Sequence, residues 1–226
     1  MITAASNSRI KRLVQLNQKS KLRRTEDVFL AEGVKMFLEA PREQLQEVYV
    51  SESFLEKCSC REHLEEVGYE VVSDSVFSKI SDTCTPQGVL CVLKQFHYNI
   101  EEMLRDKAPL FLLLENIQDP GNLGTMLRTG EGAGVSGIIM SRDTVDLYNP
   151  KVIRSTMGSI YRVPFYYADD FAAAVHQVQQ AGVSVYAAHL RGKNSYACQD
   201  YTKGTAFLIG CLLYTSPSPR DTERSR

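Results

Sequence analysis

Hydrophobic residues along this chain follow two kinds of pattern, one typical of strands and one typical of helices. Short apolar runs such as residues 110–114 (LFLLL) end at polar residues, as strands buried on both faces do. Other segments repeat apolar residues every three or four positions, as helices with one buried face do. In the second half, strands and helices alternate, which predicts a parallel, doubly wound sheet.

The apolar periods and the turn residues between them predict where each element lies. Strands are expected over residues 28–31, 47–50, 69–72, 89–93, 110–114, 137–141, 163–166, 183–188 and 205–210. Helices are expected over 8–18, 33–39, 52–66, 76–80, 123–133, 150–158 and 171–180, with a helical turn at 100–105. The fold class is therefore α/β, with a small domain over 1–95, a polar linker over 96–109 and a parallel-sheet domain over 110–210.

Residues 115–137 (ENIQDPGNLGTMLRTGEGAGVSG) form the most informative stretch. Asp119-Pro120-Gly121 predicts a type II turn, after which Asn122 is expected to cap a helix. Arg128 lies on that helix. Its planar guanidinium suits a phosphate, but a salt bridge with Glu131 or Asp119 fits the spacing equally well. In parallel sheets, sites lie beyond the carboxyl ends of the strands, so we expect a cleft bordered by the loops at 116–122, 141–149 and 187–192 and by the chain just after Gly210.

Composition narrows the class of protein. The 226 residues are 43% hydrophobic, with a net charge of −1. No apolar run approaches the roughly 18 residues that a membrane span needs, and the N-terminus lacks a signal-peptide pattern, so a cytoplasmic protein without a membrane partner is expected. The six cysteines form no C-x-x-C pair, so no metal site is predicted.

The near-neutral total hides a basic N-terminus. Residues 1–24 contain seven cations and no acid. Such a segment is either a phosphate-binding surface or a solvated helix face, and charge alone leaves both open. The candidate RNA-binding residues here are Arg9, Lys11, Arg12, Lys21, Arg23 and Arg24.

The last 16 residues, 211–226 (CLLYTSPSPRDTERSR), have no apolar period. Residues 211–221 look like a translated sequencing adapter. We therefore expect that the natural sequence departs after Gly210 and that the tail is not native; a natural disordered tail is the alternative. Sequencing the genomic locus beyond the Gly210 codon distinguishes the two.

Three segments carry a family resemblance. Residues 115–135 (ENIQDPGNLGTMLRTGEGAGV) closely resemble the first signature motif of the SpoU (TrmH-type) RNA 2′-O-ribose methyltransferases of the SPOUT superfamily. Residues 151–164 (KVIRSTMGSIYRVP) resemble the family's R-x-S-x-G segment. The N-terminal part, with NSRIKRLVQL, FLAEG and SDTCTPQGVLCV, is similar to the ribosomal-protein-like RNA-binding domain found ahead of these enzymes. The resemblance covers residues 1–210.

The resemblance implies a fold, a reaction and partners. It implies a C-terminal trefoil knot, S-adenosylmethionine bound in the knot loops and a homodimer with a shared active site. Asn122 and Arg128 match the motif's functional Asn and Arg, and Arg128 would bind the target phosphate and help activate the ribose 2′-OH. The implied cofactor-binding residues are Ala188, Leu208, Ile209 and Gly210; Arg154 and Ser155 are added to the RNA-binding candidates.

One departure from the family pattern changes the expectation for this chain. Residues 211–213 (CLL) stand where the family's second motif continues with Asn-Glu-Gly, and the third motif is not found. The knot is therefore expected to be incomplete, and the chain to bind S-adenosylmethionine poorly and to be inactive. The parent protein is expected to methylate ribosomal RNA. A transfer-RNA 2′-O-methyltransferase, a non-catalytic RNA-binding protein of the same fold and a small-molecule enzyme are the alternatives.

Overall fold

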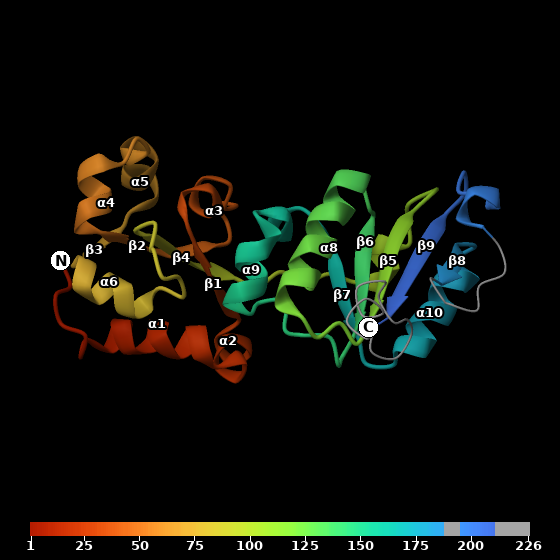
Figure 1. The fold of residues 1–226 in the computed structure, drawn as a ribbon, viewed down its shortest axis with the longest axis horizontal. Helices are drawn as coiled ribbons and strands as arrows, with labels where there is room; N and C mark the ends of the chain where they lie inside the picture. Colours follow the sequence, from red (N-terminus) through yellow and green to blue (C-terminus); the bar gives the residue numbers. More distant parts are fainter. Residues whose placement is uncertain (188–194, 211–226) are drawn as a thin grey trace, which may run out of the picture. The chain divides into compact units, whose positions relative to one another are not determined.

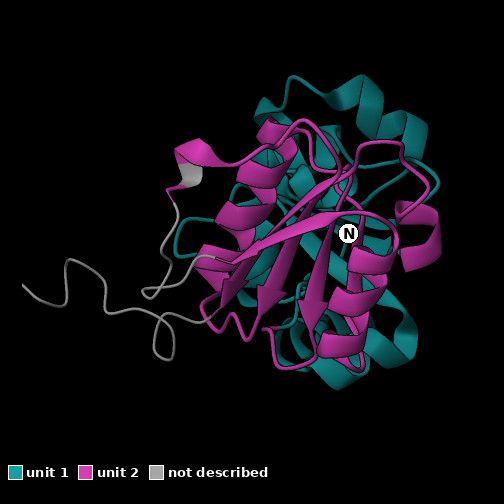
Figure 2. Ribbon diagram, turned by 90° about the vertical axis from the view of Figure 1, so that its right-hand side faces the viewer, with its two compact units in different colours: residues 1–96, 146–161 teal, residues 97–145, 162–226 magenta. Residues whose placement is uncertain are grey.

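The computed structural model describes residues 1–187 and 195–210, which form two compact α/β units (Figure 2). Unit 1 comprises Met1–Phe96 together with Asp146–Tyr161, and unit 2 comprises His97–Val145 and the chain from Arg162 onward. The sequence-based division assigned residues 146–161 to the second domain. By their contacts they belong to unit 1.

Unit 1 is built on a four-stranded sheet of order β1-β4-β2-β3. The strands are β1 (Val28–Glu32), β2 (Leu45–Ser51), β3 (Glu70–Val72) and β4 (Val89–Lys94). β4 runs antiparallel to β1 and β2, whereas β2 and β3 are parallel. The predicted strands over these segments are confirmed to within two residues at either end.

Two helices, α1 (Ser8–Gln18) and α6 (Asp74–Ile80), cover one face of this sheet (Figure 1). The Asn7 side chain caps α1 by accepting a hydrogen bond from the Arg9 amide. Apolar residues of α1 at three-residue spacing then face the core, where Ile10, Leu13 and Leu16 are buried. The short α2 (Ser20–Glu26) follows α1 directly.

Other short helices complete unit 1: α3 (Val34–Leu38), α4 (Glu52–Lys57) and α5 (Arg61–Val67). The prediction that 52–66 is mostly helical and stops at Gly68 is confirmed, but the backbone of Cys58 is extended, ends α4 and so divides the segment into two helices. Segment 146–161 contributes α9 (Pro150–Thr156) and the 3-10 turn η1 (Ser159–Tyr161), and α9 packs against β1.

Unit 2 contains a five-stranded, entirely parallel sheet of order β7-β6-β5-β9-β8 (Figure 1), which confirms the predicted architecture. Its strands are β5 (Leu110–Glu115), β6 (Gly137–Ser141), β7 (Phe165–Ala168), β8 (Ser184–Ala187) and β9 (Thr205–Gly210). The helix α8 (Pro120–Ala133) lies on one face, and α7 (Ile100–Met103) and α10 (Phe171–Gln180) lie on the other; η2 (Tyr196–Cys198) precedes β9.

The core of unit 2 follows from the alternation of side chains along β5. Phe111 and Leu113 point to the face covered by α10 and are fully buried. β5 lies at the centre of the sheet, and its neighbours β6 and β9 are far apart in sequence. The chain order thus reverses at β5, which is where ligands bind in open parallel sheets. Across the described ranges, no helix has the length and hydropathy to cross a bilayer.

Candidate functional site

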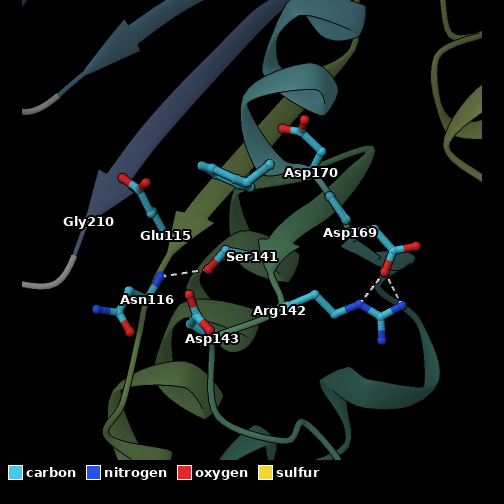
Figure 3. A pocket seen from close by; sticks show the side chains of 10 residues that line it. Glu115, Asn116, Ser141, Arg142, Asp143, Asp169, Asp170 and Gly210 are labelled. Carbon is cyan, nitrogen blue, oxygen red and sulfur yellow. Dashed lines mark hydrogen bonds and ion pairs between the residues drawn. The ribbon is translucent and has the colours of Figure 1, made fainter.

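A cavity of about 550 Å³ opens at the carboxyl ends of four strands of unit 2 (Figure 3). Pairing of Glu115 with Gly210 across β5 and β9 brings two of its walls together. Its lining residues are Glu115, Asn116, Ser141, Arg142, Asp143, Ala168, Asp169, Asp170, Phe171 and Gly210. The cavity therefore lies where a parallel sheet predicts a binding site.

The lining of this cavity is predominantly acidic. Glu115, Asp143 and Asp170 contribute carboxylates, and Asp169 forms an ion pair with Arg142, the one cation among the described lining residues (Figure 3). Because Asp169 neutralises Arg142, the remaining charge is negative. The lining favours a cationic or hydrogen-bonding ligand over a phosphate.

Two buried hydroxyls hold the loop that leaves β5. Asn116 adopts a left-handed conformation with φ of 54°, and its amide donates to Ser141 Oγ at 2.8 Å (Figure 3). The Ile117 amide donates to Thr144 Oγ1 at 3.3 Å. Ser141 and Thr144 are 7% and 5% exposed, so these bonds are shielded from water. The loop is thereby fixed to the end of β6 before α8 begins.

The start of α8 differs from the predicted turn and cap. Asp119, not Asn122, is the N-cap: its Oδ1 accepts a hydrogen bond from the Asn122 amide at 2.7 Å. Pro120 occupies the first helical position, where its missing N–H and fixed φ suit a helix start. The predicted type II turn is therefore wrong, and Asn122 lies inside the first turn of α8.

Asn122 and Arg128 are both exposed on α8, and neither lines the cavity. The sequence left open whether Arg128 pairs with Glu131 or Asp119. Glu131 instead binds Arg162, and Asp119 caps the helix. Among the described residues, Arg128 forms neither an ion pair nor a side-chain hydrogen bond, so its guanidinium is available to a ligand.

The proposed cofactor residues lie at the end of β9. Leu208, Ile209 and Gly210 are half-buried, and Gly210 lines the cavity. Ala188 lies outside the described residues. No group of three or more potential metal ligands occurs in the part of the chain that the structure describes.

The basic N-terminal residues separate into two groups. Arg9 pairs with Glu70 at 2.7 Å, and Arg12 pairs with Glu26 at 2.7 Å and with Glu47 at 2.8 Å. The second group comprises Lys11, Lys21 and Arg24, which are exposed and form no ion pair with a described residue.

Arg23 is a correction to the sequence-based set. Its side chain is 3% exposed and binds Asp146 at 2.6 Å and the carbonyl of Leu16 at 2.7 Å. An RNA phosphate cannot reach a guanidinium buried in this way, so we remove Arg23 from the RNA-binding candidates. Its Nε is buried without a hydrogen-bond partner among the described residues.

The two candidates on α9 also have partners. Arg154 is half-exposed and contacts Asp82 at 3.3 Å, a weak exposed pair that an RNA phosphate could displace. Ser155 donates its hydroxyl to carbonyls of its own helix, those of Lys151 and Val152. The loop at 141–149 was predicted to border the site, but the roles of Ser141 and Thr144 in it were not, although hydroxyl residues directly after an apolar strand are a signal for such a role.

The parallel sheet, the second α/β unit and the motif loop define a two-unit protein of the SpoU methyltransferase type. The model of the SpoU rRNA Methylase family matches residues 109–211, and that of the MRM3-like substrate binding domain matches residues 7–91. The chain is 30% identical over 212 residues to the 23S rRNA (guanosine(2553)-2′-O)-methyltransferase RlmP of Bacillus subtilis, covering 92% of this chain and 81% of that protein.

Further similarities agree. The human mitochondrial rRNA methyltransferase 3 is 41% identical over 88 residues, covering 37% of this chain and 21% of that protein. The crystal structure of an rRNA methyltransferase from Sinorhizobium meliloti matches with a TM-score of 0.82 at 27% identity, covering 99% of this chain and 85% of that one. An AdoMet-bound structure of such an enzyme matches with a TM-score of 0.79, at the same identity and coverage. The chain belongs to the SpoU rRNA methylase family.

Proposed function

We propose that this protein is an RNA 2′-O-ribose methyltransferase that transfers a methyl group from S-adenosylmethionine to ribosomal RNA. The observation that carries the proposal is Arg128, exposed and unpaired among the described residues, on a helix whose preceding loop is fixed by Ser141 and Thr144. Family membership and the relatives that act on ribosomal RNA support the substrate class.

Arg128 acts by binding and orienting the RNA. Its pKa lies above about 12, so it stays charged and cannot serve as a simple base. The guanidinium binds the phosphate next to the target ribose and stabilises negative charge as the 2′-OH loses its proton. Asn122 lies nearly two turns before Arg128 on α8, where its amide can hydrogen-bond to the same nucleotide. The Asp119 cap fixes the start of α8, where Asn122 lies in the first turn.

The described residues fit the proposed donor. When bound, S-adenosylmethionine supplies a methyl group on a positively charged sulfur, which is already an activated donor. The cavity volume of about 550 Å³ is in the range for a ligand of that size. The acidic lining, with Glu115 beside Gly210, suits the ligand's positive charge. These residues would hold the donor.

The proposal also concerns the location, the oligomeric state and the target RNA of the protein. We infer that the protein is cytoplasmic and acts as a homodimer through unit 2. The alternative targets are transfer RNA or, for a non-catalytic protein, RNA bound without methyl transfer. The expectation that the 226-residue chain binds S-adenosylmethionine weakly stays a prediction; isothermal titration tests it, and micromolar binding would contradict it.

Mapping ribose methylation in RNA from cells with and without the gene tests the proposed function. Loss of a 2′-O-methyl group from ribosomal RNA is expected without the gene. Complementation with Arg128→Ala is expected to leave the site unmethylated. The matched control is Arg105→Ala, another exposed arginine of unit 2, which should restore methylation. Unchanged ribosomal RNA in the disrupted strain would refute the target, and full methylation by Arg128→Ala would remove its role.

A further inference from the structure

Unit 1 exposes cations on two segments that are far apart in sequence. Lys19, Lys21 and Arg24 lie on α2 and its N-cap, and Lys151 lies in the first turn of α9. Within the described ranges none of the four forms an ion pair. The result is an excess of positive charge that is free to meet an anion.

The neighbouring acids do not neutralise these cations. On α2 itself, Glu26 is bound by Arg12 at 2.7 Å. Ahead of α9, Asp146 is bound by Arg23 at 2.6 Å. Both carboxylates therefore already have arginine partners, and the lysines remain available.

The Arg23–Asp146 pair joins α2 to the segment that leads into α9. Arg23 also donates to the carbonyls of Leu16 and Asn17 at the end of α1, at 2.7 Å and 3.2 Å. The backbone carbonyl of Asp146 accepts a hydrogen bond from the Asn149 amide at 2.9 Å, which folds the chain into a tight turn just before Pro150. The chain just before the first turn of α9 is thus tied to α2 through Arg23.

Two tyrosines fix the rest of this segment within unit 1. The Tyr148 hydroxyl accepts from the Phe96 amide at 2.7 Å and donates to the Phe96 carbonyl at 3.0 Å. The Tyr161 hydroxyl donates to the Met36 carbonyl at 3.0 Å. Segment 146–161 is therefore anchored at its beginning and its end, and α9 is a fixed part of unit 1.

We propose that Lys21, Arg24 and Lys151 form a single binding surface for the RNA sugar–phosphate backbone, assembled by the buried Arg23–Asp146 pair. The inference rests on the proposed function, and it adds Lys151 and the joining of α2 to α9. Lys21 and Arg24 are three residues apart and so are neighbours on the surface of α2. Each cation that contacts a phosphate releases counterions, so its contribution can be measured from the salt dependence of the binding constant.

The test measures binding of a fluorescent oligouridine by anisotropy as a function of salt. A short oligomer has few phosphates, so its binding reports on one local surface. The salt slope is the slope of the logarithm of the binding constant against the logarithm of the salt concentration. Lys151→Ala is expected to reduce its magnitude by about 0.7 and the affinity about fivefold at 0.1 M salt. Lys21→Ala with Arg24→Ala is expected to reduce the slope by about 1.4.

The matched control is Lys57→Ala, an exposed lysine at the end of α4, a helix that packs against β2. It should leave the slope unchanged. If only one of the two sets of substitutions weakens binding of the short oligomer, the surfaces are separate and the inference is wrong. If the wild-type chain binds no RNA, the proposed function fails first, so the two failures are distinguishable.

Asp146→Asn tests the assembling role of the ion pair. By charge alone, losing a carboxylate should tighten RNA binding. If the pair sets the geometry of the surface, binding of the short oligomer should instead weaken by at least the fivefold expected for Lys151→Ala. Tighter or unchanged binding by a folded Asp146→Asn variant would overturn the role of the pair.

Discussion

The buried ion pair between Arg23 and Asp146 makes a stability prediction for unit 1. Asp146→Asn keeps the shape of the side chain and an oxygen that can still accept the Tyr148 amide, but it removes the negative charge. Arg23, at 3% exposure, then retains a buried charge with only backbone carbonyls and a neutral amide around it. The loss of unfolding free energy therefore measures the cost of burying a guanidinium without a carboxylate partner.

The magnitude follows from the burial of the two partners. Breaking a fully buried pair costs roughly 3–5 kcal/mol, because one charge is left without compensation. Asp146 is 29% exposed and the carbonyls of Leu16 and Asn17 remain in place, so the full value does not apply. We expect a loss of about 2–3 kcal/mol, well above the ~0.3–0.5 kcal/mol of an exposed helical pair.

Hydrogen exchange followed by mass spectrometry measures this loss locally. Amides of α1 and α9 should exchange about 30- to 150-fold faster in Asp146→Asn, since about 1.4 kcal/mol corresponds to a factor of ten. Peptides from β5 and β6 provide a reference in unit 2. The control variant is Glu65→Gln, which removes the partner of Arg61 in an exposed i,i+4 pair. An Asp146→Asn effect no larger than that of the control would refute the reasoning.

Four further outcomes follow from local contacts. Thr144→Val should cost about 1–3 kcal/mol, because the Ile117 amide loses a buried acceptor, and Thr144→Ser should restore most of it in thermal unfolding. Gly132→Ala, with open space around the added methyl group, should stabilise α8 by about 0.5–1 kcal/mol, whereas Gly130→Ala should gain less, since its Cβ would lie 3.1 Å from Val135; thermal melts compare them. Burial raises the pKa of the Cys91 thiol, so iodoacetamide should modify exposed Cys84 quickly and Cys91 only on unfolding; rapid native labelling of Cys91 would contradict its burial. Burial, followed by the hydrogen bond and charge of Glu47, raises the pKa of Tyr49, so the folded state favours the protonated phenol. The stability that this provides is complete below the ordinary pKa of about 10 and declines above it. Tyr49→Phe should flatten this decline in urea titrations at alkaline pH.

The periods of apolar residues sufficed to predict most of the fold. Strands such as β5 and β6 are continuous apolar runs, so burial on both faces leaves little choice of structure. The cap of α8 was mispredicted because Asp119 and Asn122 are both good N-cap residues. Pro120 contained the deciding signal, since proline favours the position directly after the cap. The error therefore lay in the weighing of local signals, not in their absence.

The grouping of residues 146–161 with unit 1 could not be predicted from local pattern. Asn149-Pro150 correctly predicted the start of α9, but the position of that helix depends on Arg23, which is 123 residues before Asp146. A basic residue in a run of cations is predicted to be exposed. Only the tertiary partner, which one sequence does not reveal, makes its burial favourable.

The chemistry of arginine explains why Arg12 and Arg23 each bind several acceptors. An arginine presents five N–H donors in a planar fork, so one side chain can bind several acceptors at once. Arg12 uses this to hold two carboxylates, and Arg23 to hold a carboxylate and two carbonyls. The lysines of the same segment, each a compact and strongly hydrated charge, remain exposed without an ion pair to a described residue. Arg23→Lys would keep the positive charge but lose the planar guanidinium that binds Asp146 and two carbonyls. It should therefore destabilise unit 1, although the net charge of the chain is unchanged.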